Sequence, residues 1–74
     1  MNKEIKMPKF TKIQALLVEH EDTYEDLAKI IDSGITTVQY KLSGKRKWNW
    51  TDMIKIKNHY KLSDEKFMSI FFNF

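Results

Sequence analysis

The sequence predicts an all-α fold, a compact bundle of about five short helices, and three observations lead to this expectation. Apolar residues recur three or four positions apart in successive segments, which is the spacing of a buried helical stripe. Residues that cap helices or allow tight turns stand between these segments. The chain has 74 residues, a length that suits one domain with one core.

The chain opens with a basic segment, and the first helix follows it. We expect residues 1–8 to form a flexible basic N-terminal arm and residues 9–74 to form a single domain. Apolar spacing predicts the first helix over residues 10–20. Its buried face is expected to consist of Phe10, Ile13, Leu16 and Leu17.

The second helix is expected over residues 24–31. Thr23 offers an N-cap hydroxyl, and Asp26 stands three positions later, as in a capping box. The inward side chains are Leu27, Ala28 and Ile31. Residues 32–34 then form a turn, in which Gly34 tolerates a positive φ.

The third helix is expected over residues 35–43 and ends at Gly44, a residue suited to a left-handed cap. Val38 and Leu42, four positions apart, point inward, with Ile35 as a third candidate. The positions left to face outward are Thr36, Thr37, Gln39, Tyr40 and Ser43.

Two further helices complete the bundle. The fourth is expected over residues 50–60, capped by Asn49, and the fifth begins after a second cap, Ser63. Asp64 and Glu65 suit the positive end of the fifth helix dipole. The side chains expected in the core are Trp48, Trp50, Met53, Ile56, Tyr60, Phe67, Ile70 and Phe71. For the two tryptophans, the alternative is a platform on which single-stranded bases stack.

Charge is distributed unevenly along the chain, although the net charge is only +3. Residues 19–32 contain six acids and one lysine, whereas residues 41–61 contain seven basic residues and one acid, Asp52. A polyanion would be attracted to the second of these segments, because local charge steers association. The alternative is that these lysines only form a solvated surface.

The second and third helices fit a helix-turn-helix, since both are short and a turn containing glycine joins them. In that motif the second helix lies in the DNA major groove. Glutamine can bond bidentately to adenine, and serine or threonine hydroxyls can bond to several bases. Phosphate contacts are expected from the residues that follow, Lys45, Arg46 and Lys47. The sequence therefore predicts binding to a double-stranded DNA operator.

Several motifs occur in a fixed order: Thr23-x-Glu25-x-Leu27-Ala28, then Val38, then KLSGKR over residues 41–46, then an aromatic residue and a capped helix. In these features, over about residues 10–72, the chain resembles the lambda-repressor/Cro-type helix-turn-helix family. The resemblance is strongest to small Cro-like or repression-modulating proteins of temperate phages of Gram-positive bacteria. It implies DNA contacts from Tyr24, Thr36, Thr37, Gln39, Tyr40 and Ser43.

Two functions remain open from the sequence. The first is a sequence-specific DNA-binding regulator, a Cro-like protein of the phage switch between lysis and lysogeny. The second is an antirepressor, which keeps the helix-turn-helix fold but binds the cognate phage repressor and alters its DNA binding. The acids of residues 19–26 favour the second, because they would repel DNA or attract a basic DNA-binding face.

The C-terminal segment is too apolar for one buried face. If Phe67, Ile70 and Phe71 face the core, then Met68, Phe72 and Phe74 remain outside it. Exposed apolar clusters of this kind usually mark an interface. A homodimer or docking onto another regulator would use them. The alternative is that the segment folds back onto the small core.

Other classes of function lack support in the sequence. The chain has no cysteine, which excludes disulfides and thiolate metal sites, and His20 and His59 have no ligand spacing. Ser33 and Ser43 have no evident partners for nucleophilic catalysis, so we expect no enzyme, metal or cofactor. Apolar runs are too short to span a membrane and no secretory signal is evident, so we expect a cytoplasmic location, and the resemblance implies that the cell is a bacterial host.

Overall fold

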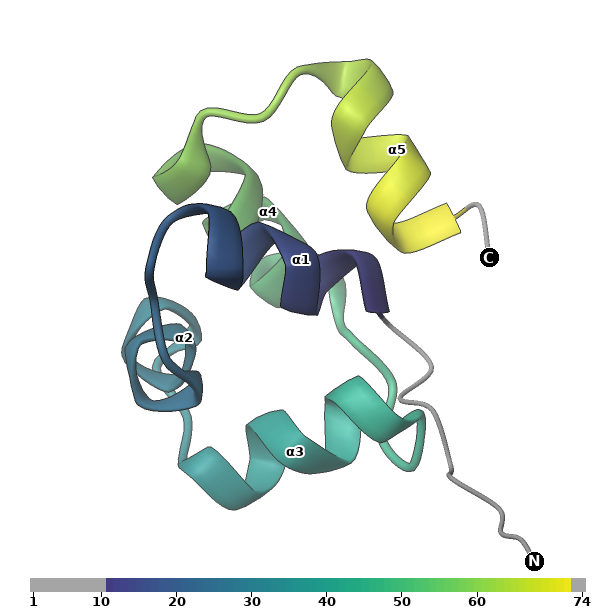
Figure 1. Cartoon of the computed structure of the whole chain (residues 1–74). Coiled ribbons are helices and arrows are strands. Elements are labelled where there is room, and N and C mark those ends of the chain that lie inside the picture. The colour runs from purple at the N-terminus through teal and green to yellow at the C-terminus, as the bar shows by residue number, and fades with distance from the viewer. Residues whose placement is uncertain (1–10, 73–74) are drawn as a thin grey trace, which may run out of the picture.

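The computed structural model describes residues 11–72, and all the regular secondary structure in this part of the chain is helical (Figure 1). Its helices are α1 (Thr11–Glu19), α2 (Tyr24–Ile31), α3 (Ile35–Ser43), α4 (Trp50–Tyr60) and α5 (Asp64–Phe72). The predicted all-α fold with five short helices is confirmed, and the bounds of α2, α3 and α4 agree with the expected ones. The expected arm, residues 1–8, lies outside the described residues, as does Phe10.

Local capping explains where the helices begin. The Thr23 hydroxyl accepts a hydrogen bond from the Asp26 amide at 3.1 Å, and the Asp26 carboxylate accepts one from the Thr23 amide at 2.8 Å. This is the capping box that the sequence predicts. The Asn49 side-chain oxygen likewise accepts a hydrogen bond from the Asp52 amide at 2.8 Å. At the start of α5, the Ser63 hydroxyl accepts one from the Lys66 amide at 3.1 Å.

The turn between α2 and α3 differs from expectation in one respect. The left-handed residue is Asp32, with φ 60°, whereas Gly34 has φ −84°. Asp32 is the C-cap of α2, and the amides of Asp32 and Ser33 donate to the carbonyls of Lys29 and Ala28 at 3.2 and 2.9 Å. Aspartate tolerates this conformation better than most side chains. Gly34 therefore acts as the extended N-cap of α3, and its expected positive φ is wrong.

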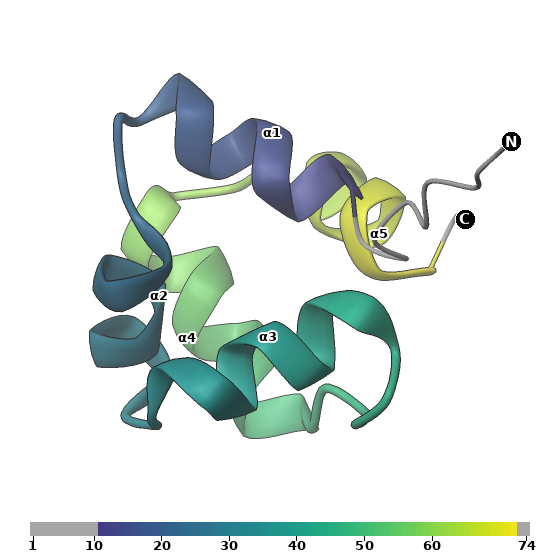
Figure 2. The same cartoon turned by 60° about the horizontal axis from the view of Figure 1, so that its bottom comes forward.

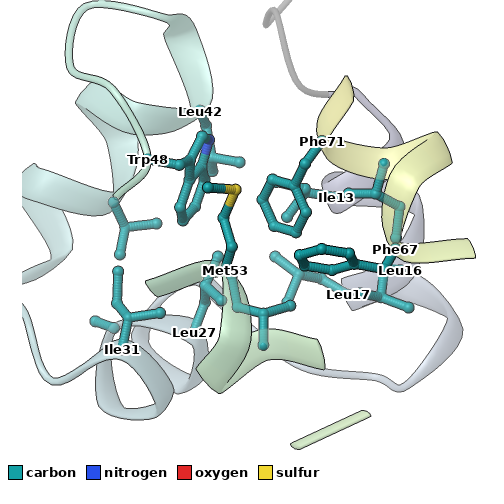
Figure 3. Close-up of a cluster of buried hydrophobic side chains, with 14 residues drawn as sticks. Ile13, Leu16, Leu17, Leu27, Ile31, Leu42, Trp48, Met53, Phe67 and Phe71 are labelled. Atoms are coloured by element: carbon teal, nitrogen blue, oxygen red, sulfur yellow. The ribbon is translucent and has the colours of Figure 1, made fainter. Parts of the chain in front are cut away.

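The core lies where the helices meet, and it contains most of the predicted residues. Ile13, Leu27 and Ile56 are fully buried, and Trp48 packs among Leu42, Met53 and Phe71 (Figure 3). The rings of Trp48 and Phe71 meet edge to face, with centroids 5.7 Å apart. The buried faces predicted for α2 and α5 are confirmed.

Three expected core positions are corrected. Trp50 is 61% exposed: its ring lies at the surface of α4 against Phe67, whereas Trp48, two residues earlier, is buried in the core. Ile35, in the first turn of α3, is 40% exposed. Tyr60 is only partly buried.

Helix α3 forms the lower edge of the molecule in Figure 1, and the turned view of Figure 2 brings it to the front, where it faces the viewer. Helix α2 packs against both α3 and α4. Helix α5 lies beside the start of α1, where the Lys12 ammonium donates to the carbonyl and the hydroxyl of Ser69 at 3.2 and 2.9 Å. Among residues 11–72, no helix has the length and apolar character needed to cross a membrane.

Candidate functional site

The outer surface of α3 carries a polar stripe. Thr36, Gln39, Tyr40 and Ser43 are exposed, and their spacing of three, four and seven positions places them on one side of the helix. We call these four residues the α3 face. Thr37 is half-buried, so it does not lie fully outward as the sequence suggested.

The chain after α3 folds back tightly onto the last helical turn. Gly44 takes a left-handed φ of 88°, as predicted. The Tyr40 carbonyl then accepts hydrogen bonds from the amides of Lys45 and Arg46, at 2.8 and 3.2 Å, and from the Ser43 hydroxyl at 3.0 Å. These bonds fix the backbone of the turn relative to the α3 face.

The side chains of that turn place positive charge beside the stripe. Lys45, Arg46 and Lys47, which we call the basic turn, are all exposed. The Lys45 ammonium lies 5.5 Å from the centroid of the Tyr40 ring, and the Arg46 guanidinium carbon lies 5.8 Å from it. One aromatic ring of the α3 face thus holds two cations, which is a cation–π arrangement. The same cations complement the negative end of the α3 dipole.

Tyr24 does not stand open to solvent as the resemblance implied. It is half-buried and packs against the core from the start of α2. Its hydroxyl accepts a hydrogen bond from the side-chain amide of Gln14, on α1. Tyr24 therefore joins α2 to α1.

A buried ion pair that the sequence reasoning missed supports α3 from behind. The Lys41 ammonium donates to the Asp52 carboxylate, and both side chains are buried between α3 and α4. The Lys41 ammonium also lies 5.8 Å from the centroid of the Trp48 ring. A signal was present in the sequence, because Asp52 is the one acid in an otherwise basic stretch.

The exposed positive charge of residues 41–61 is consequently smaller than the sequence suggests. Lys41 is neutralised by Asp52, and the Lys57 ammonium lies 3.2 Å from the carboxylate of Asp64. The basic residues of this stretch that stay exposed are Lys45, Arg46, Lys47, Lys55 and Lys61. Of these, the basic turn forms the densest group.

Negative charge gathers where α1 leads into α2. Glu19, Glu21 and Glu25 are exposed there, with Asp22 half-buried, and we call these four residues the acidic corner. The hydroxyl of Tyr60 donates to the Asp22 carboxylate. Burial, together with Asp22, raises the pKa of Tyr60 well above its usual range, so the phenol keeps its proton and remains a donor.

The residues expected to form a C-terminal interface are only partly described. Met68 and Phe72 are exposed, as expected, and Phe74 lies outside the described residues.

Within residues 11–72, no three side chains of the metal-binding types lie close enough together to hold an ion. Comparisons of the chain with protein-family models, with curated proteins and with solved structures found no match.

Proposed function

We propose that the chain is a DNA-binding transcription regulator, a Cro-like phage switch protein in which α2 and α3 form a helix-turn-helix. The observation that carries the proposal is the continuity between the α3 face and the basic turn. A stripe of hydroxyl and amide groups ends directly at three exposed cations, and backbone bonds to the Tyr40 carbonyl fix one relative to the other.

The two parts of this surface suit different contacts with a duplex. Gln39 can bond bidentately to adenine, and the hydroxyls of Thr36 and Ser43 can bond to base edges in the major groove. Lys45 and Arg46 would bind phosphates, which sets the register of α3 and supplies most of the affinity. Lys45 and Arg46 already lie against the Tyr40 ring before DNA binds. Their side chains therefore lose less conformational freedom when they contact the phosphates of the DNA.

The packing of the motif agrees with this use. Helices α2 and α3 contact each other, three residues separate them, and α3 lies along the lower edge of the molecule in Figure 1. A helix at an edge can enter a groove without a clash from its neighbours. The buried pair of Lys41 and Asp52 holds α3 against α4 and leaves the α3 face outward.

The acidic corner favours a second candidate, an antirepressor that binds the basic DNA-binding face of the phage repressor. Glu25 is exposed on α2, the helix that packs against α3, and Glu19 and Glu21 are exposed at the end of α1 and in the turn that leads to α2. Phosphates near this corner would be repelled, whereas a basic protein surface would be attracted. In this case the chain acts by competing with DNA for the repressor.

Gel shifts with DNA from the phage's own switch region, with and without the cognate repressor, separate the two functions. A regulator of the first kind shifts this DNA by itself and prefers it to a random duplex. An antirepressor leaves the DNA unshifted and removes the shift caused by the repressor. A chain that neither shifts this DNA nor removes the shift caused by the repressor would contradict both proposals.

A further inference from the structure

A second surface, distinct from the α3 face, is formed by α4 and α5. Trp50 and Ile54 lie four positions apart on α4, and Met68 and Phe72 lie four positions apart on α5, so each pair shares one side of its helix. We call these four residues the α4/α5 patch. Trp50, Met68 and Phe72 are 61%, 52% and 50% exposed, respectively.

The buried ring of Phe67 connects the members of the patch. Its centroid lies 6.0 Å from the Trp50 ring and 6.2 Å from the Phe72 ring, and both contacts are edge to face. Trp50, Ile54, Phe67 and Met68 also line a shallow hollow of about 480 Å³. The patch is therefore one continuous apolar surface and not a set of scattered side chains, which is the kind of surface that marks an interface.

The charges at the patch identify the kind of partner. Lys57 and Asp64 are the charged residues that line the hollow, and they pair with each other at 3.2 Å. The hollow thus carries no net charge that would attract DNA or a charged protein face. Two such surfaces can meet face to face without bringing an unpaired charge into the contact.

The composition of the patch leads to the same partner. Cores of homodimer interfaces are enriched in aromatic residues and methionine and depleted of charged residues. A two-fold axis brings the same surface of both copies together, so one self-complementary patch suffices. We propose that the α4/α5 patch forms a symmetric interface with a second copy of this chain.

The size of the patch predicts that this dimer is weak. A fully exposed aromatic side chain offers about 150–250 Å², so Trp50 and Phe72 together expose roughly 250 Å² per copy. Even with Met68 and Ile54 added, two copies bury roughly 800 Å² in these side chains, less than the about 1,200 Å² at which stable specific interfaces begin. The association should therefore be reversible and visible only at micromolar to millimolar concentrations.

Sedimentation velocity of the full chain without DNA, over that concentration range, tests the proposal independently of the proposed function. We expect the average sedimentation coefficient of the parent chain to rise with concentration to the value of a dimer. Met68→Glu and Met68→Lys should each weaken self-association by about tenfold or more, because each puts like charges across the two-fold axis. An equimolar mixture of the two variants should associate again, since the charges are then opposite.

Val18→Glu is the matched control, because Val18 is an apolar residue of α1 that is 77% exposed and lies outside the patch. It should associate like the parent chain, and circular dichroism should be the same for all variants. A parent chain that stays monomeric throughout the range would overturn the proposal, and the patch would then be a surface for a different protein. Unchanged association of Met68→Glu, or no association in the mixture, would overturn it equally.

Discussion

The Lys41 ammonium and the Asp52 carboxylate form a buried ion pair that joins α3 to α4. Lys41 belongs to the helix that carries the proposed DNA-binding surface, and Asp52 stands in the first turn of α4. Two ionised side chains in the interior are tolerated because each satisfies the other. The pair therefore fixes the rotation of α3 and keeps its polar residues on the outside.

Removing one partner of this pair should destabilise the fold. Asp52→Ala leaves the Lys41 charge buried without compensation, and we expect a loss of about 3–5 kcal/mol in the free energy of unfolding. The double variant Lys41→Met, Asp52→Leu should recover most of this loss, because apolar groups of similar size replace both charges. Urea unfolding measures both values. A double variant as unstable as Asp52→Ala would show that the pair does not act as a unit.

Val38→Asp should unfold the domain. Val38 is fully buried on α3, and a lone carboxylate there costs several kcal/mol, about as much as the total stability of a small domain. Thr36→Asp, at an exposed position of the same helix, is the control and should leave the melting temperature nearly unchanged. Equal melting temperatures for the two variants would mean that the buried side of α3 is misassigned.

The capping box of α2 should make stability depend on acid pH. The amide and the hydroxyl of Thr23 donate to the Asp26 carboxylate, and they hold the pKa of Asp26 below its ordinary value of 3.8. A carboxyl with a lowered native pKa stabilises the fold above its unfolded pKa and loses this effect as the pH falls through its native pKa. Asp26→Asn should therefore be less stable than the parent at neutral pH, and the difference should vanish in acid. Thermal unfolding as a function of pH checks this, and a difference independent of pH would contradict it.

Helix bounds could be predicted from the sequence because the signals that set them are local. Thr23 and Asn49 cap their helices through contacts only three residues long, and Gly44 closes α3 in the left-handed conformation. The exposed positions of the α3 face followed from the same spacing that buries Val38 and Leu42. These features depend on neighbours in the chain and need no knowledge of the tertiary fold.

Apart from the turn at Asp32 and Gly34, the clearest misassignments depend on contacts between helices. Trp50 fits the apolar stripe of α4 but stays at the surface, whereas Trp48, just before the helix, is buried, and periodicity alone cannot say which tryptophan the neighbouring helices cover. Lys41 looked like part of the solvated basic stretch until α4 brought Asp52 against it. The α4/α5 patch likewise joins residues far apart in sequence, so only its α5 half could be foreseen.

Single substitutions in the basic turn should change the salt dependence of DNA binding. Each phosphate contact contributes about 0.9 to the slope of log K against log salt concentration, so Lys45→Ala or Arg46→Ala should each flatten the slope by about that amount. Affinity for specific and random duplexes should fall alike, because phosphates carry no sequence information. Fluorescence anisotropy in a salt series measures the slope, and Lys66→Ala, on α5, should leave it unchanged. Unchanged slopes for both turn variants would show that the basic turn does not bind phosphate.

The most direct test of the proposed function is the binding of Gln39→Ala to two duplexes, the preferred DNA of the parent chain and a random sequence of equal length. Gln39 is exposed at the centre of the α3 face, where it can read a base but supports no core contact. We expect the variant to lose about 1–3 kcal/mol of binding free energy on the preferred duplex and almost none on the random one. Equal losses on both duplexes, or none on either, would contradict a reading role for α3.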